Sequence, residues 1–98
     1  MQIPEEFNQF VIGIYPGIPH DWKSLESLAA AGLEMSSAKE RPVVLAFLNE
    51  LLDGGYSDAD IEDAWNMQSP SYNFSAGGHR VFLEIVRRQI TNKDRKLG

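Results

Sequence analysis

The sequence predicts an all-α fold, a compact bundle of four or five short helices that forms a single domain over residues 1–90. Apolar residues recur at spacings of three and four along most of the chain, which is the period of an amphipathic helix. Glycines and prolines separate these stretches, and serine or acidic residues precede several of them, as at helix starts. A chain of 98 residues fits one domain, and its apolar fraction of 43% is enough for a small core.

Residues 4–15 are expected to form the first helix. Pro4 and the two glutamates after it suit a first turn, because proline costs little there and carboxylates favour the positive end of the helix dipole. The residues at helical spacing on one apolar stripe are Phe7, Phe10, Val11 and Ile14. A short strand is the alternative here, because several residues of this stretch are β-branched.

The second helix is expected to run from a cap at Asp21 to about Ala31. The residues on its apolar face are Trp22, Leu25, Leu28 and Ala29. Gly32 stands where a C-cap glycine would end the helix, since glycine adopts left-handed backbone conformations freely.

The third helix has the strongest signal. Ser37 and Glu40 have the spacing of a capping box, in which the serine oxygen accepts a backbone N–H and the glutamate reaches back. Pro42 lies close to the first turn, where a proline is tolerated. The residues of its wide apolar face are Val44, Leu45, Phe47, Leu48, Leu51 and Leu52. Gly54 and Gly55 are expected to end the helix.

A short fourth helix follows, capped by Ser57. Its first turns carry the carboxylates of Asp58, Asp60, Glu62 and Asp63. Each well-placed carboxylate complements the positive end of a helix by about 0.3–1 kcal/mol. The residues expected on its buried side are Ile61, Ala64 and Trp65.

The last helix is expected to follow a loop over residues 66–75 and to run from Gly77 or Gly78 to Ile90. The residues of its apolar face are Val81, Phe82, Leu83, Ile85, Val86, Gln89 and Ile90. Residues 91–98 are polar and basic, and we expect them to form a frayed C-terminal tail.

Charge is unevenly distributed along the chain. Residues 1–79 carry a balance of −9 and residues 80–98 a balance of +4, which together give the net charge of −5. An acidic surface repels phosphate, so we expect no nucleic-acid partner, whereas a basic protein partner would be attracted. The plainer interpretation is that the acidity keeps the protein soluble.

We expect a cytoplasmic protein without a membrane partner. The longest apolar runs are far too short to span a bilayer. The N-terminus lacks the pattern of a secretory signal, and the absence of cysteine favours a reducing compartment.

No catalytic or metal-binding motif stands out, so we expect no enzyme activity, no cofactor and no metal. His20 and His79 are far apart in sequence, and each is expected to be a solvated loop or cap residue. The acidic cluster over residues 53–63 lacks the fifth and sixth residues of a calcium-binding EF-hand loop. A charged helix start that faces water is the plain interpretation of this cluster, and a binding patch is the other.

Residues 44–90 contain several motifs in a defined order. LLDGGYSDADI over residues 51–61 is followed by Trp65, then by YNFS over residues 72–75, and finally by RVFLEIVR over residues 80–87. In this order and spacing the chain resembles small bacterial immunity proteins of contact-dependent growth inhibition systems. The resemblance covers about half of the chain, and residues 1–36 lie outside it.

The resemblance implies a protein that binds the toxin domain of a partner adhesin, often a nuclease, in the cytoplasm and blocks it. A nuclease holds phosphates with basic residues, which fits an acidic inhibitor. We therefore hypothesise that carboxylates and nearby tyrosines bind the toxin by mimicking the charge of its substrate, an assignment that rests on charge. The candidate partner-binding residues are Asp53, Tyr56, Asp58, Asp60, Glu62, Asp63 and Tyr72.

Three other functions remain open at this point. The chain could be an adaptor or regulatory subunit with the same acidic face, a small enzyme or metal protein that uses the carboxylate cluster, or a nucleic-acid binder that uses the basic tail. A monomer outside the complex is the simplest expectation. The broad apolar faces of the third and last helices are the feature that would support a dimer.

Overall fold

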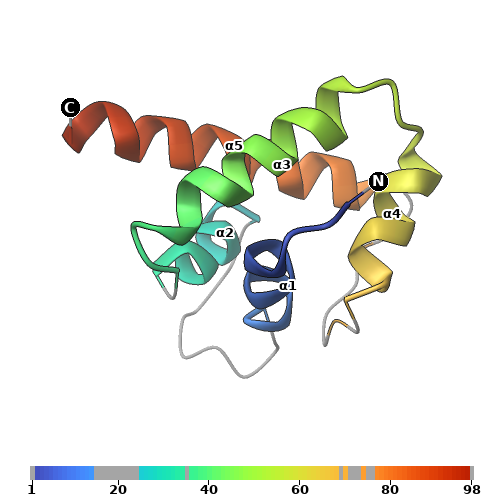
Figure 1. Cartoon of the computed structure of the whole chain (residues 1–98), viewed down its shortest axis with the longest axis horizontal. Coiled ribbons are helices and arrows are strands. Elements are labelled where there is room, and N and C mark those ends of the chain that lie inside the picture. Colours follow the sequence, from blue (N-terminus) through green and yellow to red (C-terminus); the bar gives the residue numbers. More distant parts are fainter. Residues whose placement is uncertain are drawn as a thin grey trace.

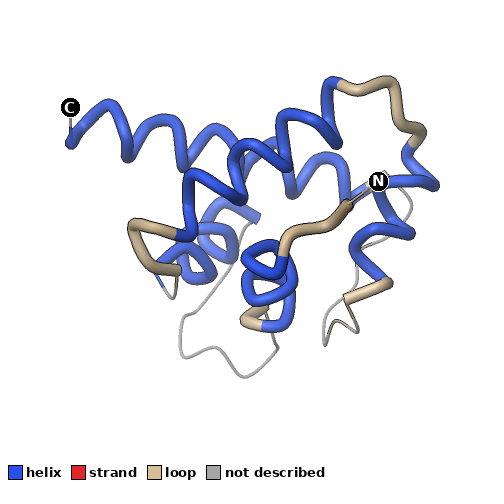
Figure 2. Tube along the Cα trace, in the orientation of Figure 1, coloured by secondary structure: helices blue, strands red, loops and turns tan. Residues whose placement is uncertain are grey.

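A computed structural model of the chain describes residues 2–14, 25–34, 36–68, 70, 74 and 77–97. These described residues form five helices and no strand (Figures 1 and 2). The helices are α1 (Glu5–Ile12), α2 (Leu25–Glu34), α3 (Glu40–Asp53), α4 (Asp58–Asn66) and α5 (Gly78–Leu97). The predicted all-α bundle is therefore confirmed.

α5 is the central element of the bundle. It packs against α2, α3 and α4, while α1 packs against α3. In Figure 1, α4 lies near the N-terminal end of α5, and α2 lies below its middle and C-terminal part. Large, fully buried apolar side chains of the core include Phe7, Leu28, Leu48, Leu51, Ile61, Trp65, Phe82, Leu83 and Ile90. Burial of one leucine, isoleucine or phenylalanine contributes roughly 1.5–3 kcal/mol, so this core holds the five helices together.

α1 confirms the first expected helix, and the alternative of a strand is wrong for Glu5–Ile12. Pro4 is the N-cap residue and has an extended backbone, so the helix begins one residue later than the proline. The ring of Phe7 packs against Phe47 of α3 with 4.7 Å between the ring centroids. Ile12 is exposed, so burial follows the helical stripe and not a run of β-branched residues.

α2 ends later than the sequence predicts. Gly32 is buried within the helix, which continues to Glu34, so its assignment as a C-cap is wrong. A Cβ at this position would collide with Ile14 and come within 3.2 Å of Phe10, so the glycine allows α2 to approach the α1 segment closely. The expected cap Asp21, with Trp22, lies outside the described residues.

The capping box and the C-terminal end predicted for α3 are confirmed, but the helix itself begins only at Glu40, after its N-cap residue Lys39. Ser37 Oγ accepts a hydrogen bond from the Glu40 N–H at 3.2 Å, and Glu40 Oε1 accepts one from the Ser37 N–H at 3.4 Å. Pro42 lies in the first turn, where its missing N–H leaves no helical bond unmade. After Asp53, Gly55 takes a φ of +84°, a left-handed conformation that favours glycine.

α5 is longer than the sequence predicts. It begins at Gly78 as expected but continues to Leu97, so the predicted end near Ile90 is wrong. Residues 91–97 contain no glycine or proline that would stop the helix. Thr91 Oγ1 donates to the carbonyl of Arg87 at 3.0 Å, one turn earlier in the same helix. In the described part of the chain, no helix is both long and apolar enough to cross a bilayer.

Candidate functional site

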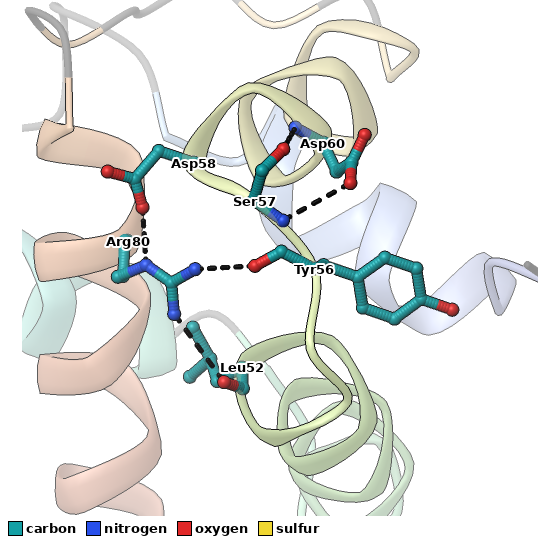
Figure 3. A network of polar contacts seen from close by, with 6 residues as sticks. All are labelled: Leu52, Tyr56, Ser57, Asp58, Asp60 and Arg80. Carbon is teal, nitrogen blue, oxygen red and sulfur yellow. Dashed lines mark hydrogen bonds and ion pairs between the residues drawn. The ribbon is translucent and has the colours of Figure 1, made fainter.

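The connection between α3 and α4 passes beside the start of α5 and leads into the acidic first turn of α4, where Asp58 faces α5 (Figure 3). Ser57 caps α4 as predicted, because its Oγ accepts from the Asp60 N–H at 3.1 Å. Asp60 Oδ2 accepts from the Ser57 N–H at 3.2 Å, which completes a capping box. Asp60 is therefore held in place by the cap while its side chain stays exposed.

Arg80, in the first turn of α5, joins three segments of the chain (Figure 3). Its Nε donates to Asp58 Oδ1, and its Nη2 donates to the Tyr56 carbonyl at 2.7 Å. Its Nη1 donates to the Leu52 carbonyl in the last turn of α3 at 3.5 Å. The guanidinium thus holds the end of α3, the connection and the start of α4 against α5.

Arg87, two turns further along α5, pairs with a second predicted site residue. Its Nη1 donates to Asp53 Oδ2 at 2.8 Å and to Asn49 Oδ1 at 3.5 Å. Asp53 and Asp58 remain 66% and 59% exposed, so water screens both ion pairs and each contributes about 1 kcal/mol or less. Nearby arginines offset the charge of these two carboxylates, which weakens their attraction for a distant basic partner.

The remaining predicted residues have different environments. Glu62 is half-buried, and Asp63 beside it is exposed. Tyr56 is half-buried and packs against the core. Tyr72 lies outside the described residues, so its predicted role in the site has no structural description. Of the seven candidates, Tyr56, Asp60 and Asp63 are brought together on one surface.

These three residues line a groove between α4, the connection and the N-terminal segment. The groove has a volume of about 380 Å³ and is also lined by Ile3, Ala64 and Met67. Met67 is 73% exposed, an unusual position for a large apolar side chain, whereas Ala64 is buried. Sequence reasoning missed Ile3 because it lies more than fifty residues from the other lining residues. It missed Met67 because this residue comes after the last residue of the predicted apolar stripe of α4. The groove combines apolar walls with two carboxylates.

His79 is buried, so the expectation of a solvated loop or cap residue is wrong. Its ring makes edge contacts with Trp65 at 5.9 Å and with Phe74 at 5.3 Å between centroids. Burial lowers the pKa of His79 below its usual value of 6.5, and the charge of Glu62 opposes part of this shift. A signal was available, because His79 lies three residues before Phe82 and continues the buried stripe of α5.

A second acidic groove lies between α1, α2 and the start of α3, and sequence reasoning missed it. It has a volume of about 560 Å³, and the charged residues that line it are Glu5, Glu6 and Glu40. Glu40 already accepts a hydrogen bond from Ser37 in the cap of α3. These carboxylates come from two helices, and their proximity depends on the packing of α1 against α3.

Within residues 2–14, 25–34, 36–68, 70, 74 and 77–92, no three histidine, aspartate or glutamate side chains are grouped so that they could hold a metal ion. Comparison of the chain with protein-family models, with curated proteins and with solved structures finds no match.

Proposed function

We propose that this protein is an immunity protein that binds a basic toxin domain, such as a nuclease, in the cytoplasm and neutralises it. The observation that carries the proposal is the exposed acidic surface of α4, where Asp60 and Asp63 flank an apolar groove. The motifs over residues 51–87, which resemble those of immunity proteins from contact-dependent growth inhibition systems, agree with it.

The ion pairs of α5 narrow the surface that would attract the toxin. Asp53 and Asp58 are paired with arginines, and these pairs orient both carboxylates toward α5. Among the candidate carboxylates, Asp60, Glu62 and Asp63 then carry the charge available to a partner. Such a patch raises the association rate of a basic partner and excludes the partner's own polyanionic substrate from the contact surface.

Neutralisation is tested by producing a candidate toxin domain, encoded directly upstream of this gene, in host cells with and without this chain. We expect the toxin domain to stop growth when produced alone and the chain to restore it. Purified chain and toxin domain should also form a one-to-one complex. Growth arrest that the chain does not relieve, with no complex between the purified proteins, would contradict the proposal.

The contact surface is tested with the double variant Glu62→Lys and Asp63→Lys. We expect its association rate with the toxin domain to fall and the salt dependence of that rate to flatten, because attraction is replaced by repulsion. The matched control is Glu26→Lys with Glu50→Lys, which changes the net charge equally at exposed positions on α2 and α3. Equal rates for the two folded double variants would show that α4 is not the contact surface.

A further inference from the structure

We infer that the groove beside α4 receives one arginine side chain of the partner protein, an inference that rests on the proposed binding of a basic protein. Its lining residues are Ile3, Tyr56, Asp60, Asp63, Ala64 and Met67. The apolar walls fit the methylene stem of an arginine, and the two carboxylates fit its guanidinium.

The apolar part of the groove consists of three buried or partly buried side chains and one exposed, flexible side chain. Ala64 is buried, and Ile3 and Tyr56 are partly buried against the core. Met67 is exposed, and a methionine side chain is flexible enough to close over an aliphatic stem. The ring of Tyr56 adds a face on which a guanidinium stacks favourably.

The carboxylates lie at the edge of this apolar surface. Asp60 and Asp63 are three residues apart on α4 and therefore project from the same side of the helix. The capping bond to the Ser57 N–H uses Oδ2 of Asp60, and a carboxylate has several further acceptor positions. A planar guanidinium with five N–H donors is able to reach both carboxylates and keep a ring contact.

Arg80 shows how this connection already binds a guanidinium on its opposite side. In Figure 3 the Asp58 side chain is directed toward Arg80, whereas the Tyr56 ring and the Asp60 carboxylate lie on the side away from it. On the Arg80 side, the arginine comes from α5 of the same chain. On the groove side, the complementary cation would come from the partner.

The inference is tested by NMR with protein labelled with ¹⁵N and with ¹³C at the methionine methyl groups, and with Nα-acetyl-arginine methylamide as the probe, at constant ionic strength. We expect saturable shifts confined to the Met67 methyl group and to the amides near Ala64. The lysine analogue should bind at least twofold more weakly, because it has neither the fork nor the stacking plane. The norleucine analogue, which has no charge, should bind more weakly still.

Matched variants separate the two parts of the site. Asp63→Asn and Met67→Gln should each weaken binding of the arginine probe about two- to fivefold, the range expected for an exposed ion pair or a partial apolar contact. Glu26→Gln, which removes a charge from exposed α2, should leave binding unchanged. Chemical shifts of the free variants report whether each remains folded.

Several results would overturn the inference. Unsaturable shifts spread over all acidic residues, equal binding of the lysine or norleucine probe, or unchanged binding by Asp63→Asn would each do so. If toxin neutralisation is then still observed, the inference about the groove alone has failed. If the arginine probe binds as expected but no toxin domain is neutralised, the proposed function has failed and the groove remains an arginine site.

Discussion

Arg80 Nε donates a hydrogen bond to Asp58 Oδ1 across 22 positions of sequence, from the first turn of α5 to the first residue of α4. The same guanidinium donates to the carbonyls of Tyr56 and Leu52. Carbonyls in the last turn of a helix have no partner within that helix, so the contact with Leu52 satisfies an acceptor that α3 leaves open. The arginine therefore determines how α4 is held relative to α3 and α5.

Replacement of Arg80 should lower the free energy of unfolding. Arg80→Ala removes three hydrogen bonds, two of them to backbone carbonyls, and we expect a loss of about 1–3 kcal/mol. Arg80→Lys should lose less stability than Arg80→Ala, because an ammonium keeps the positive charge. It should still lose some, because an ammonium cannot bond all three acceptors. Urea denaturation measures both, with Arg88→Ala at an exposed position of α5 as the control. Equal losses for Arg80→Ala and Arg88→Ala would contradict the joining role.

Loss of the α4 cap should destabilise the protein measurably. Ser57→Ala removes the acceptor for the Asp60 N–H, and such changes cost about 0.5–2 kcal/mol. Ser57→Asp should retain most of the stability, since aspartate is also a favourable N-cap residue. Thermal or urea unfolding distinguishes the two variants. An alanine variant as stable as the aspartate variant would indicate that the cap contributes little.

His79 should make stability depend on pH in the range where few carboxylates titrate. Because burial lowers its pKa in the folded state, the unfolded chain binds more protons, and the free energy of unfolding rises with pH. The stability is fully present above the unfolded value of 6.5 and is lost as the pH falls through 6.5 toward the lower folded pKa. The slope for one group is at most about 1.4 kcal/mol per pH unit.

The contribution of His79 is isolated by comparison with His79→Gln. We expect the difference in unfolding free energy between the wild type and this variant to shrink from pH 7.5 to pH 5.5, conditions chosen around the usual histidine pKa of about 6.5. Urea titrations at several pH values provide the measurement. A difference that stays constant with pH, or that grows on acidification, would mean that the folded pKa of His79 is not lowered.

Gly55 should be intolerant of side chains for backbone reasons alone. Its φ is +84°, and no atom beyond the adjoining residues lies within 4 Å of where a Cβ would be, so backbone strain and not a steric clash determines the loss of stability. We expect Gly55→Ala to lose about 1–2 kcal/mol, the usual penalty for an L-residue in this region. Gly55→Asn should lose less, since asparagine enters left-handed conformations more readily. If alanine is tolerated as well as asparagine in urea denaturation, the connection adopts another conformation in solution.

The sequence predicted the features of the site that depend on neighbouring residues, but not the contacts that the site makes with other helices. The cap by Ser57 and the carboxylates in the first turns of α4 follow from interactions between near neighbours in the chain. The ion pairs of Asp53 and Asp58 could not be predicted, because their arginines lie 34 and 22 positions away on another helix. The role of Met67 depends likewise on the N-terminal segment that carries Ile3.

The sequence by itself determined the all-α class, the stripes that form the core, the Ser37–Glu40 hydrogen bonds before α3 and the Ser57 cap of α4. These features arise from the helical period and from hydrogen bonds between near neighbours, so residues close together in the sequence determine them. Only the tertiary structure decided that His79 is buried, that Gly32 lies inside α2, and which carboxylates remain available to a partner. Burial and ion pairing depend on which helices face each other, and residues distant in sequence supply the contacts.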